Sequence, residues 1–95
     1  MKKKSANIFL GKKILIYGLG RTGISSYEFL KKKAEVYLFD DNPEKVRRIN
    51  KKCISLKELK LIKFDKIIIS PGIDISNCKL SNFLKKNLFK IYTDL

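Results

Sequence analysis

The chain has 95 residues, a length that suits one domain, and 44% of them are apolar, which supports a hydrophobic core and excludes a disordered chain. No run approaches the roughly 20 apolar residues that a membrane-spanning helix requires. The apolar run after the initial lysines is also too short for a signal peptide. We therefore expect a cytoplasmic protein with no membrane partner.

The formal net charge of +13 raises the question of nucleic-acid binding. However, the lysines are spread through nearly every segment, and no aromatic residues alternate with them as a stacking platform would require. We therefore do not expect nucleic acid as a partner, although the charge favours anionic ligands in general. Two cysteines without any histidine are too few ligands for a zinc site, so we predict that Cys53 and Cys78 are reduced and structural.

Short apolar runs predict the strands. The first, residues 13–17, shows no polar alternation, which is typical of a strand buried on both faces. Three of these apolar runs end at glycine, at acidic residues or just before proline, and a fourth lies near the carboxyl end of the chain. The predicted strands are residues 13–17, 35–39, 66–69 and 90–92, with a weaker one near residues 53–54.

Helical signals lie between these strands. Apolar residues recur every three positions within residues 22–32, which places them near one face. Asn42-Pro43-Glu44 combines a capping side chain, a proline at the first helical position and an acid in the first turn. Ser55 and Glu58 fit a capping box. A further helix is predicted over residues 77–87, with an apolar face made of Leu80, Phe83, Leu84 and Leu88.

Strands that alternate with helices predict an α/β fold with a parallel sheet. We expect a Rossmann-like, three-layer domain with a five-stranded parallel sheet in the order 3-2-1-4-5, because right-handed crossovers favour the doubly wound arrangement. This domain would span residues 11–95 and follow an N-terminal arm at residues 1–10.

The segment Gly18-Leu19-Gly20-Arg21-Thr22-Gly23 fits the pattern G-x-G-x-x-G between a buried strand and a helix, which is the context a phosphate-binding turn requires. The first glycine permits a tight turn, the second lets a phosphate approach the backbone, and the third lets helix and strand pack closely. The helix start then offers N–H groups and a partial positive charge to an anion.

Two further segments follow predicted strands. Asp40 comes 22 positions after Gly18, and a carboxylate about 20 residues on accepts hydrogen bonds from ribose hydroxyls in dinucleotide folds. Asp41 and Asn42 share its loop, and we expect Asn42 to cap the next helix. Ser70-Pro71-Gly72 ends a strand on the same side of the sheet, where it is either a ligand contact or a plain turn.

Complete catalytic machinery is absent from the sequence. It contains no G-x-x-x-x-G-K-[ST] loop for ATP, no histidine to act as a base and no Ser-His-Asp set. The residues by themselves therefore indicate a binding domain and not a complete catalyst.

Three ordered motifs resemble the first domain of the UDP-N-acetylmuramoyl-L-alanine:D-glutamate ligases, the MurD family of Mur ligases. Leu10-Gly11-Lys12-Lys13 leads into a short strand and the G-L-G-x-T-G turn, with threonine at its fifth position. Ser70-Pro71-Gly72-Ile73 is similar to the family's S-P-G-I, and Thr93-Asp94-Leu95 to the G-[DE]-[IL] that closes its first domain, with threonine in place of glycine.

The resemblance implies a three-domain enzyme of peptidoglycan precursor synthesis, in which ATP phosphorylates a substrate carboxylate and the amine of D-glutamate attacks the acyl phosphate. The first domain would hold the UDP part of UDP-N-acetylmuramoyl-L-alanine. Backbone N–H groups of Arg21 and Thr22 would meet the diphosphate, residues 40–42 would surround the uridine, and residues 70–72 would form the uracil side of the pocket.

The resemblance also implies that no cofactor binds this domain itself. The P-loop lysine, the metal ligands and the D-glutamate site of the family lie beyond Leu95, so ATP, Mg²⁺ and D-glutamate would require the other domains. One alternative stays open at this point. The glycine turn and Asp40 would equally serve an NAD(P)-binding module of a dehydrogenase or of an ion-transport regulator.

Overall fold

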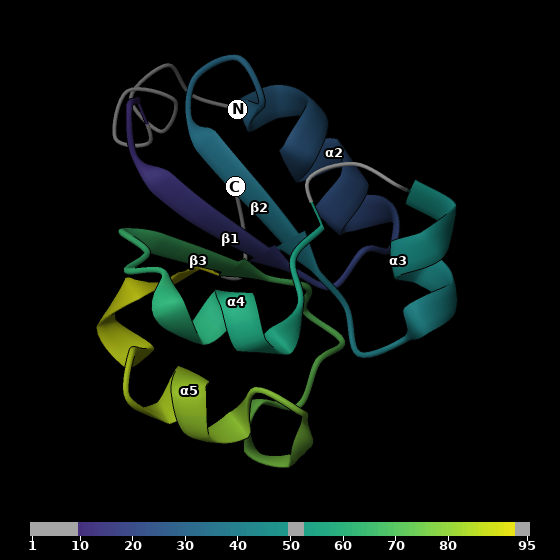
Figure 1. Cartoon of the computed structure of the whole chain (residues 1–95), viewed down its shortest axis with the longest axis vertical. Coiled ribbons are helices and arrows are strands. Elements are labelled where there is room, and N and C mark those ends of the chain that lie inside the picture. The colour runs from purple at the N-terminus through teal and green to yellow at the C-terminus, as the bar shows by residue number, and fades with distance from the viewer. Residues whose placement is uncertain (1–9, 50–52, 93–95) are drawn as a thin grey trace.

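The computed structural model describes residues 10–49 and 53–92, and within them strands and helices alternate as predicted (Figure 1). The predicted arm at residues 1–10, apart from Leu10, and the motif Thr93-Asp94-Leu95 lie outside the described residues. The elements in chain order are β1 (Lys13–Tyr17), α2 (Arg21–Leu30), β2 (Glu35–Phe39), α3 (Pro43–Ile49), α4 (Leu56–Leu61), β3 (Lys66–Ile69), the 3₁₀ turn η1 (Ile75–Asn77), α5 (Ser81–Lys85), the 3₁₀ turn η2 (Leu88–Lys90) and β4 (Ile91–Tyr92).

The sheet is parallel and its described strands follow the order β2-β1-β3-β4. Among residues 10–49 and 53–92 the sheet has four strands, so the prediction of five is wrong there, although the relative order of the other four is confirmed. The weak segment near residues 53–54 forms only an isolated parallel bridge between Cys53 and Leu38, beside β2. It extends no further because Ser55 already caps the next helix, so the chain leaves the sheet after one bridge.

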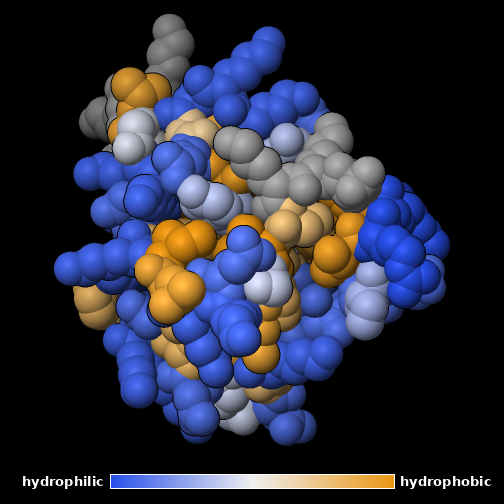
Figure 2. All heavy atoms as spheres, in the orientation of Figure 1, coloured by the Kyte–Doolittle hydropathy of each residue, from blue (hydrophilic) through white to orange (hydrophobic). Residues whose placement is uncertain are grey.

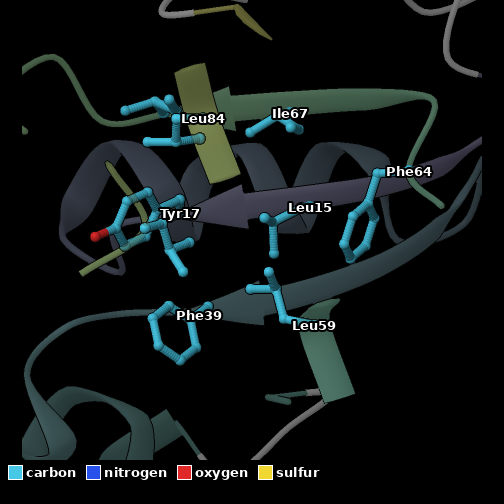
Figure 3. Close-up of a cluster of buried hydrophobic side chains, with 9 residues drawn as sticks. Leu15, Tyr17, Phe39, Leu59, Phe64, Ile67 and Leu84 are labelled. Carbon is cyan, nitrogen blue, oxygen red and sulfur yellow. The ribbon is translucent and has the colours of Figure 1, made fainter. Parts of the chain in front are cut away.

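Both faces of the sheet are covered, which confirms the predicted three layers. Successive residues of a strand point to opposite faces. Leu15 and Tyr17 therefore face the layer formed by α4 and α5, whereas Ile14 and Ile16 face the layer formed by α2 and α3. These four residues, all of β1 except the exposed Lys13, have no exposed surface, as expected for a central strand buried on both faces. Figure 3 shows the first of these two clusters, with Tyr17 at the carboxyl end of β1.

Two of the predicted helix starts have the expected caps. The Asn42 side chain accepts a hydrogen bond from the Glu44 N–H at 2.9 Å, at the start of α3. Ser55 and Glu58 exchange the two hydrogen bonds of a capping box, each 3.1 Å long. These local contacts satisfy donors that the helix ends would leave unpaired.

The helix predicted over residues 77–87 is shorter than expected. Residues 75–77 form η1, and the α-helix α5 begins only at Ser81 and ends at Lys85. Leu80 and Leu84 are buried, as predicted, but Leu88 is 57% exposed. It belongs to η2, where the chain turns toward β4 and the helical periodicity no longer applies.

The described surface is largely hydrophilic. On the face that α4 and α5 cover, hydrophilic side chains dominate and apolar ones show between them (Figure 2). Both cysteines are free, as predicted. Within residues 10–49 and 53–92, every helix is too short or too polar to span a bilayer.

Candidate functional site

The turn between β1 and α2 has the geometry that its three glycines predict. Gly18 has a φ of +103°, and a Cβ there would lie 2.7 Å from the Ser70 Cβ. A Cβ on Gly23 would lie 1.9 Å from the Gly18 carbonyl oxygen, because α2 packs directly against the end of β1. A Cβ on Gly20 would meet no atom within 4 Å, so the backbone there is open to an approaching ligand.

The amino end of α2 carries no side-chain cap. Gly20 is its capping residue, and the first backbone bond runs from the Ile24 N–H to the Gly20 carbonyl at 3.0 Å. The side chains of Arg21 and Thr22 are exposed in the first turn. First-turn N–H groups have no partner within a helix, and the helix dipole adds a partial positive charge, so this end suits an anion.

Asp40 connects the glycine turn to the loop after β2. One carboxylate oxygen accepts the Leu19 N–H at 2.6 Å, and the other accepts the Asn42 N–H at 2.8 Å. The sequence predicted a ligand role for this residue and did not predict these two structural bonds. A carboxylate has about four acceptor sites, so two remain for a ribose hydroxyl.

Asp41 is held by three hydrogen bonds from two other segments of the chain. The Tyr17 hydroxyl donates to its carboxylate at 2.6 Å, and the Lys79 backbone N–H donates to the other oxygen at 3.3 Å. The Lys79 ammonium also donates to the Asp41 carbonyl at 3.1 Å. Burial, and then the hydrogen bond to Asp41, raise the pKa of Tyr17 far above its ordinary value, so the phenol stays protonated and donates.

Ser70-Pro71-Gly72 forms a tight turn where β3 ends. The Ser70 N–H donates to the Tyr17 carbonyl at 3.0 Å, which extends the pairing of β3 with β1 by one residue. The Ile73 N–H then donates to the Ser70 carbonyl at 3.0 Å and closes the turn. This bond fixes the turn beside Gly18, at the same edge of the sheet.

These three segments surround one crevice of about 290 Å³. It lies at the carboxyl ends of β1, β2 and β3, where the sheet order reverses between neighbouring strands, which is the usual ligand position in such sheets. Its lining consists of Tyr17, Gly18, Gly20, Asp40, Asp41, Lys45, Ser70, Gly72 and Ile73.

Six predicted site residues lie in this lining, and six do not. Leu19 is buried in the core and Gly23 is packed against the turn. The other four are exposed and do not line the crevice: Arg21, Thr22, Asn42 and Pro71. Sequence reasoning missed Tyr17, Lys45 and Ile73. Tyr17 ends a predicted strand and Ile73 follows Gly72, so adjacency to the motifs was their only signal.

A larger cavity of about 450 Å³ lies on the other side of the residue 40–41 loop. Its lining is mainly apolar and comes from β2, α3 and the start of α4, including Phe39, Val46 and Leu56. It touches neither the glycine turn nor the start of α2. The smaller crevice is therefore the better candidate site for an anionic ligand.

Residues 12–91 match the family model described as Mur ligase MurD-like, N-terminal domain. The chain is also similar to proteins named UDP-N-acetylmuramoylalanine--D-glutamate ligase. It is 34% identical to that of Rickettsia felis over 87% of this chain and 19% of the relative. It is 43% identical to that of Buchnera aphidicola subsp. Schizaphis graminum over 68% of this chain and 16% of the relative.

A third such relative, from Lachnoclostridium phytofermentans, is 38% identical over 68% of this chain and 17% of its own length. This chain thus spans less than a fifth of the length of these relatives. No solved structure matches the chain significantly. The family match favours the ligase interpretation over the dinucleotide-binding module. Because the family model matches residues 12–91, which is most of the sequence, the chain belongs to the MurD-like N-terminal domain family of Mur ligases.

Proposed function

We propose that this chain is the UDP-binding domain of a UDP-N-acetylmuramoyl-L-alanine:D-glutamate ligase. The observation that carries the proposal is the crevice itself, which brings Gly18 and Gly20, Asp40 and Asp41, and Ser70 and Gly72 to one edge of the sheet. About 290 Å³ is at the lower end of the range for ligand pockets and suits part of a nucleotide.

Each segment has a proposed role. The diphosphate lies at the start of α2, where the backbone N–H groups of Arg21 and Thr22 bind it and the bare Gly20 allows its approach. The loop of residues 40–42 surrounds the uridine, with the two remaining acceptor sites of Asp40 available to the ribose. The turn of residues 70–72 forms the uracil side of the pocket.

The complete reaction requires more than these residues. The sequence contains no P-loop, and the described residues contain no group of three or more side chains that could hold a metal ion. In the proposed enzyme, ATP, Mg²⁺ and D-glutamate therefore bind other segments, and this domain supplies only the anchor for the UDP group of UDP-N-acetylmuramoyl-L-alanine. The proposed role in peptidoglycan precursor synthesis implies a cytoplasmic location.

Isothermal titration calorimetry of the 95-residue chain with UDP, UDP-N-acetylmuramoyl-L-alanine and NAD tests this proposal. We expect both uridine ligands to bind more tightly than NAD. A Gly20→Val variant is expected to fold, because a Cβ there meets no atom within 4 Å, and to lose UDP binding. Binding of NAD as tight as that of UDP, or tighter, would contradict the proposed function. Normal UDP binding by a folded Gly20→Val variant would contradict the proposed position of the phosphates.

A further inference from the structure

Lys45 is the one cationic side chain in the lining of the crevice, and no motif pointed to it. It lies in the first turn of α3, two residues after Pro43, and lines the crevice together with Gly18 and Gly20 of the glycine turn. The other charged residues of the lining are Asp40 and Asp41. Their two carboxylates would repel a diphosphate unless other groups offset them.

The two acids are already bonded to protein donors. Asp40 accepts two backbone N–H groups, and Asp41 accepts the Tyr17 hydroxyl and the Lys79 N–H. Neither of them is paired with Lys45. Among the ion pairs and hydrogen bonds of residues 10–49 and 53–92, the Lys45 ammonium has no partner, whereas Glu44 beside it pairs with Arg47 at 2.8 Å.

The position of Lys45 is also unfavourable for the helix. The amino end of a helix carries a partial positive charge, so a cation in the first turn destabilises it, and basic side chains suit the last turn. In α3 that preference is met by Arg47 and Arg48. Lys45 therefore gains neither an ion pair nor a favourable dipole interaction in α3, and it is the one lining residue that brings positive charge to the crevice.

We propose that Lys45 binds the diphosphate of the ligand in this crevice, together with the start of α2. This inference rests on the proposed function and adds a specificity residue to it. Its ammonium has three donors and no acceptor, so it recognises phosphate oxygens as a point charge. The site then distinguishes UDP from uridine by the charge of the diphosphate.

The test compares Lys45→Gln with Arg48→Gln in the 95-residue chain. Both variants remove one positive charge from α3, and Arg48 lies outside the crevice lining. At about 50 mM salt, Lys45→Gln is expected to weaken UDP binding about tenfold, the order expected for one charge-assisted hydrogen bond. Arg48→Gln is expected to change it less than about twofold, as a distant charge screened by salt.

Two further readouts separate a ligand role from a structural one. Uridine binding should be the same in the wild type and in Lys45→Gln, because uridine has no phosphate. The Tm of Lys45→Gln should equal or exceed that of the wild type, since the variant removes a cation from the helix start.

Equal losses of UDP affinity in the two variants, or an unchanged UDP affinity in Lys45→Gln, would overturn the assignment of Lys45 and leave the proposed function intact. A loss of affinity that accompanies a lower Tm would overturn it as well. Failure of the wild type to bind UDP would overturn both the assignment and the proposed function.

Discussion

Gly23→Ala tests how closely α2 approaches the end of β1. Gly23 lies inside the helix, where alanine normally gains about 1 kcal/mol over glycine. Here the added Cβ would lie 1.9 Å from the Gly18 carbonyl oxygen and 3.0 Å from the carbonyl carbon. This obstacle is backbone, and the Leu19 N–H of the same peptide group donates to the Asp40 carboxylate at 2.6 Å, so the carbonyl cannot rotate away freely.

The expected loss of stability follows from the distance between the added Cβ and the Gly18 carbonyl oxygen. Ordinary contacts of a Cβ begin at 3.4 Å, so α2 must move outward to accept the methyl group. Overpacking a core costs about 1–3 kcal/mol, and we expect a cost of about 3 kcal/mol for so severe a contact. Less the gain of about 1 kcal/mol for alanine in a helix, the net loss of stability is about 2 kcal/mol. The total free energy of unfolding of a domain of this length is roughly 5–14 kcal/mol. At about 4–8 °C per kcal/mol, the Tm should fall by about 8–16 °C in thermal unfolding followed by circular dichroism.

Gly20→Ala is the matched control. It makes the same chemical change in the same turn, but its Cβ would meet no atom within 4 Å, and its φ of −79° suits any residue. Its Tm should therefore stay within a few degrees of the wild-type value. A Tm of Gly23→Ala that equals or exceeds the wild-type value would refute the close packing of α2 on the turn.

Two further substitutions test the fold around the site. Ser55→Ala removes the side-chain cap of α4 and should cost about 1 kcal/mol, seen as a Tm lower by about 4–8 °C; an unchanged Tm would contradict the capping box. Burial and the Asp41 hydrogen bond raise the pKa of Tyr17, so the free energy of unfolding should fall as the pH rises above about 10, where an unfolded tyrosine ionises. Urea unfolding between about pH 8 and pH 11 should show a weaker decrease in Tyr17→Phe, and an identical decrease would contradict this linkage.

Local patterns carried much of the prediction. The run at residues 13–17 has no polar alternation, and it became the central strand with both faces buried. The caps at Asn42 and Ser55 formed because each depends only on residues two or three positions away. The glycine spacing likewise predicted the turn, since the limits on Gly18 and Gly23 arise within one strand-turn-helix unit.

Other predictions failed where a helix cap ends a strand signal early or where the chain must turn to reach a neighbouring strand. From Cys53 onward, the segment forms one bridge to Leu38 and no strand in the described part of the chain, because the helix cap at Ser55 redirects the chain. Leu88 continued a helical pattern, yet it lies in η2 and is exposed, because the chain must turn there to reach β4 beside β3. Periodicity reports which residues are apolar and says nothing of where the chain must turn.

The sequence alone predicted the layered α/β fold and the glycine turn, which follow from local periodicity, caps and glycine spacing, and the order of its four formed strands, which follows from the handedness of crossovers between parallel strands. Only the tertiary structure decided which side chains share the crevice. Lys79 reaches Asp41 across 38 positions of the chain, Tyr17 reaches it across 24, and Lys45 enters the lining from the next helix. Such contacts depend on how parallel strands align their ends, and no local pattern encodes that alignment.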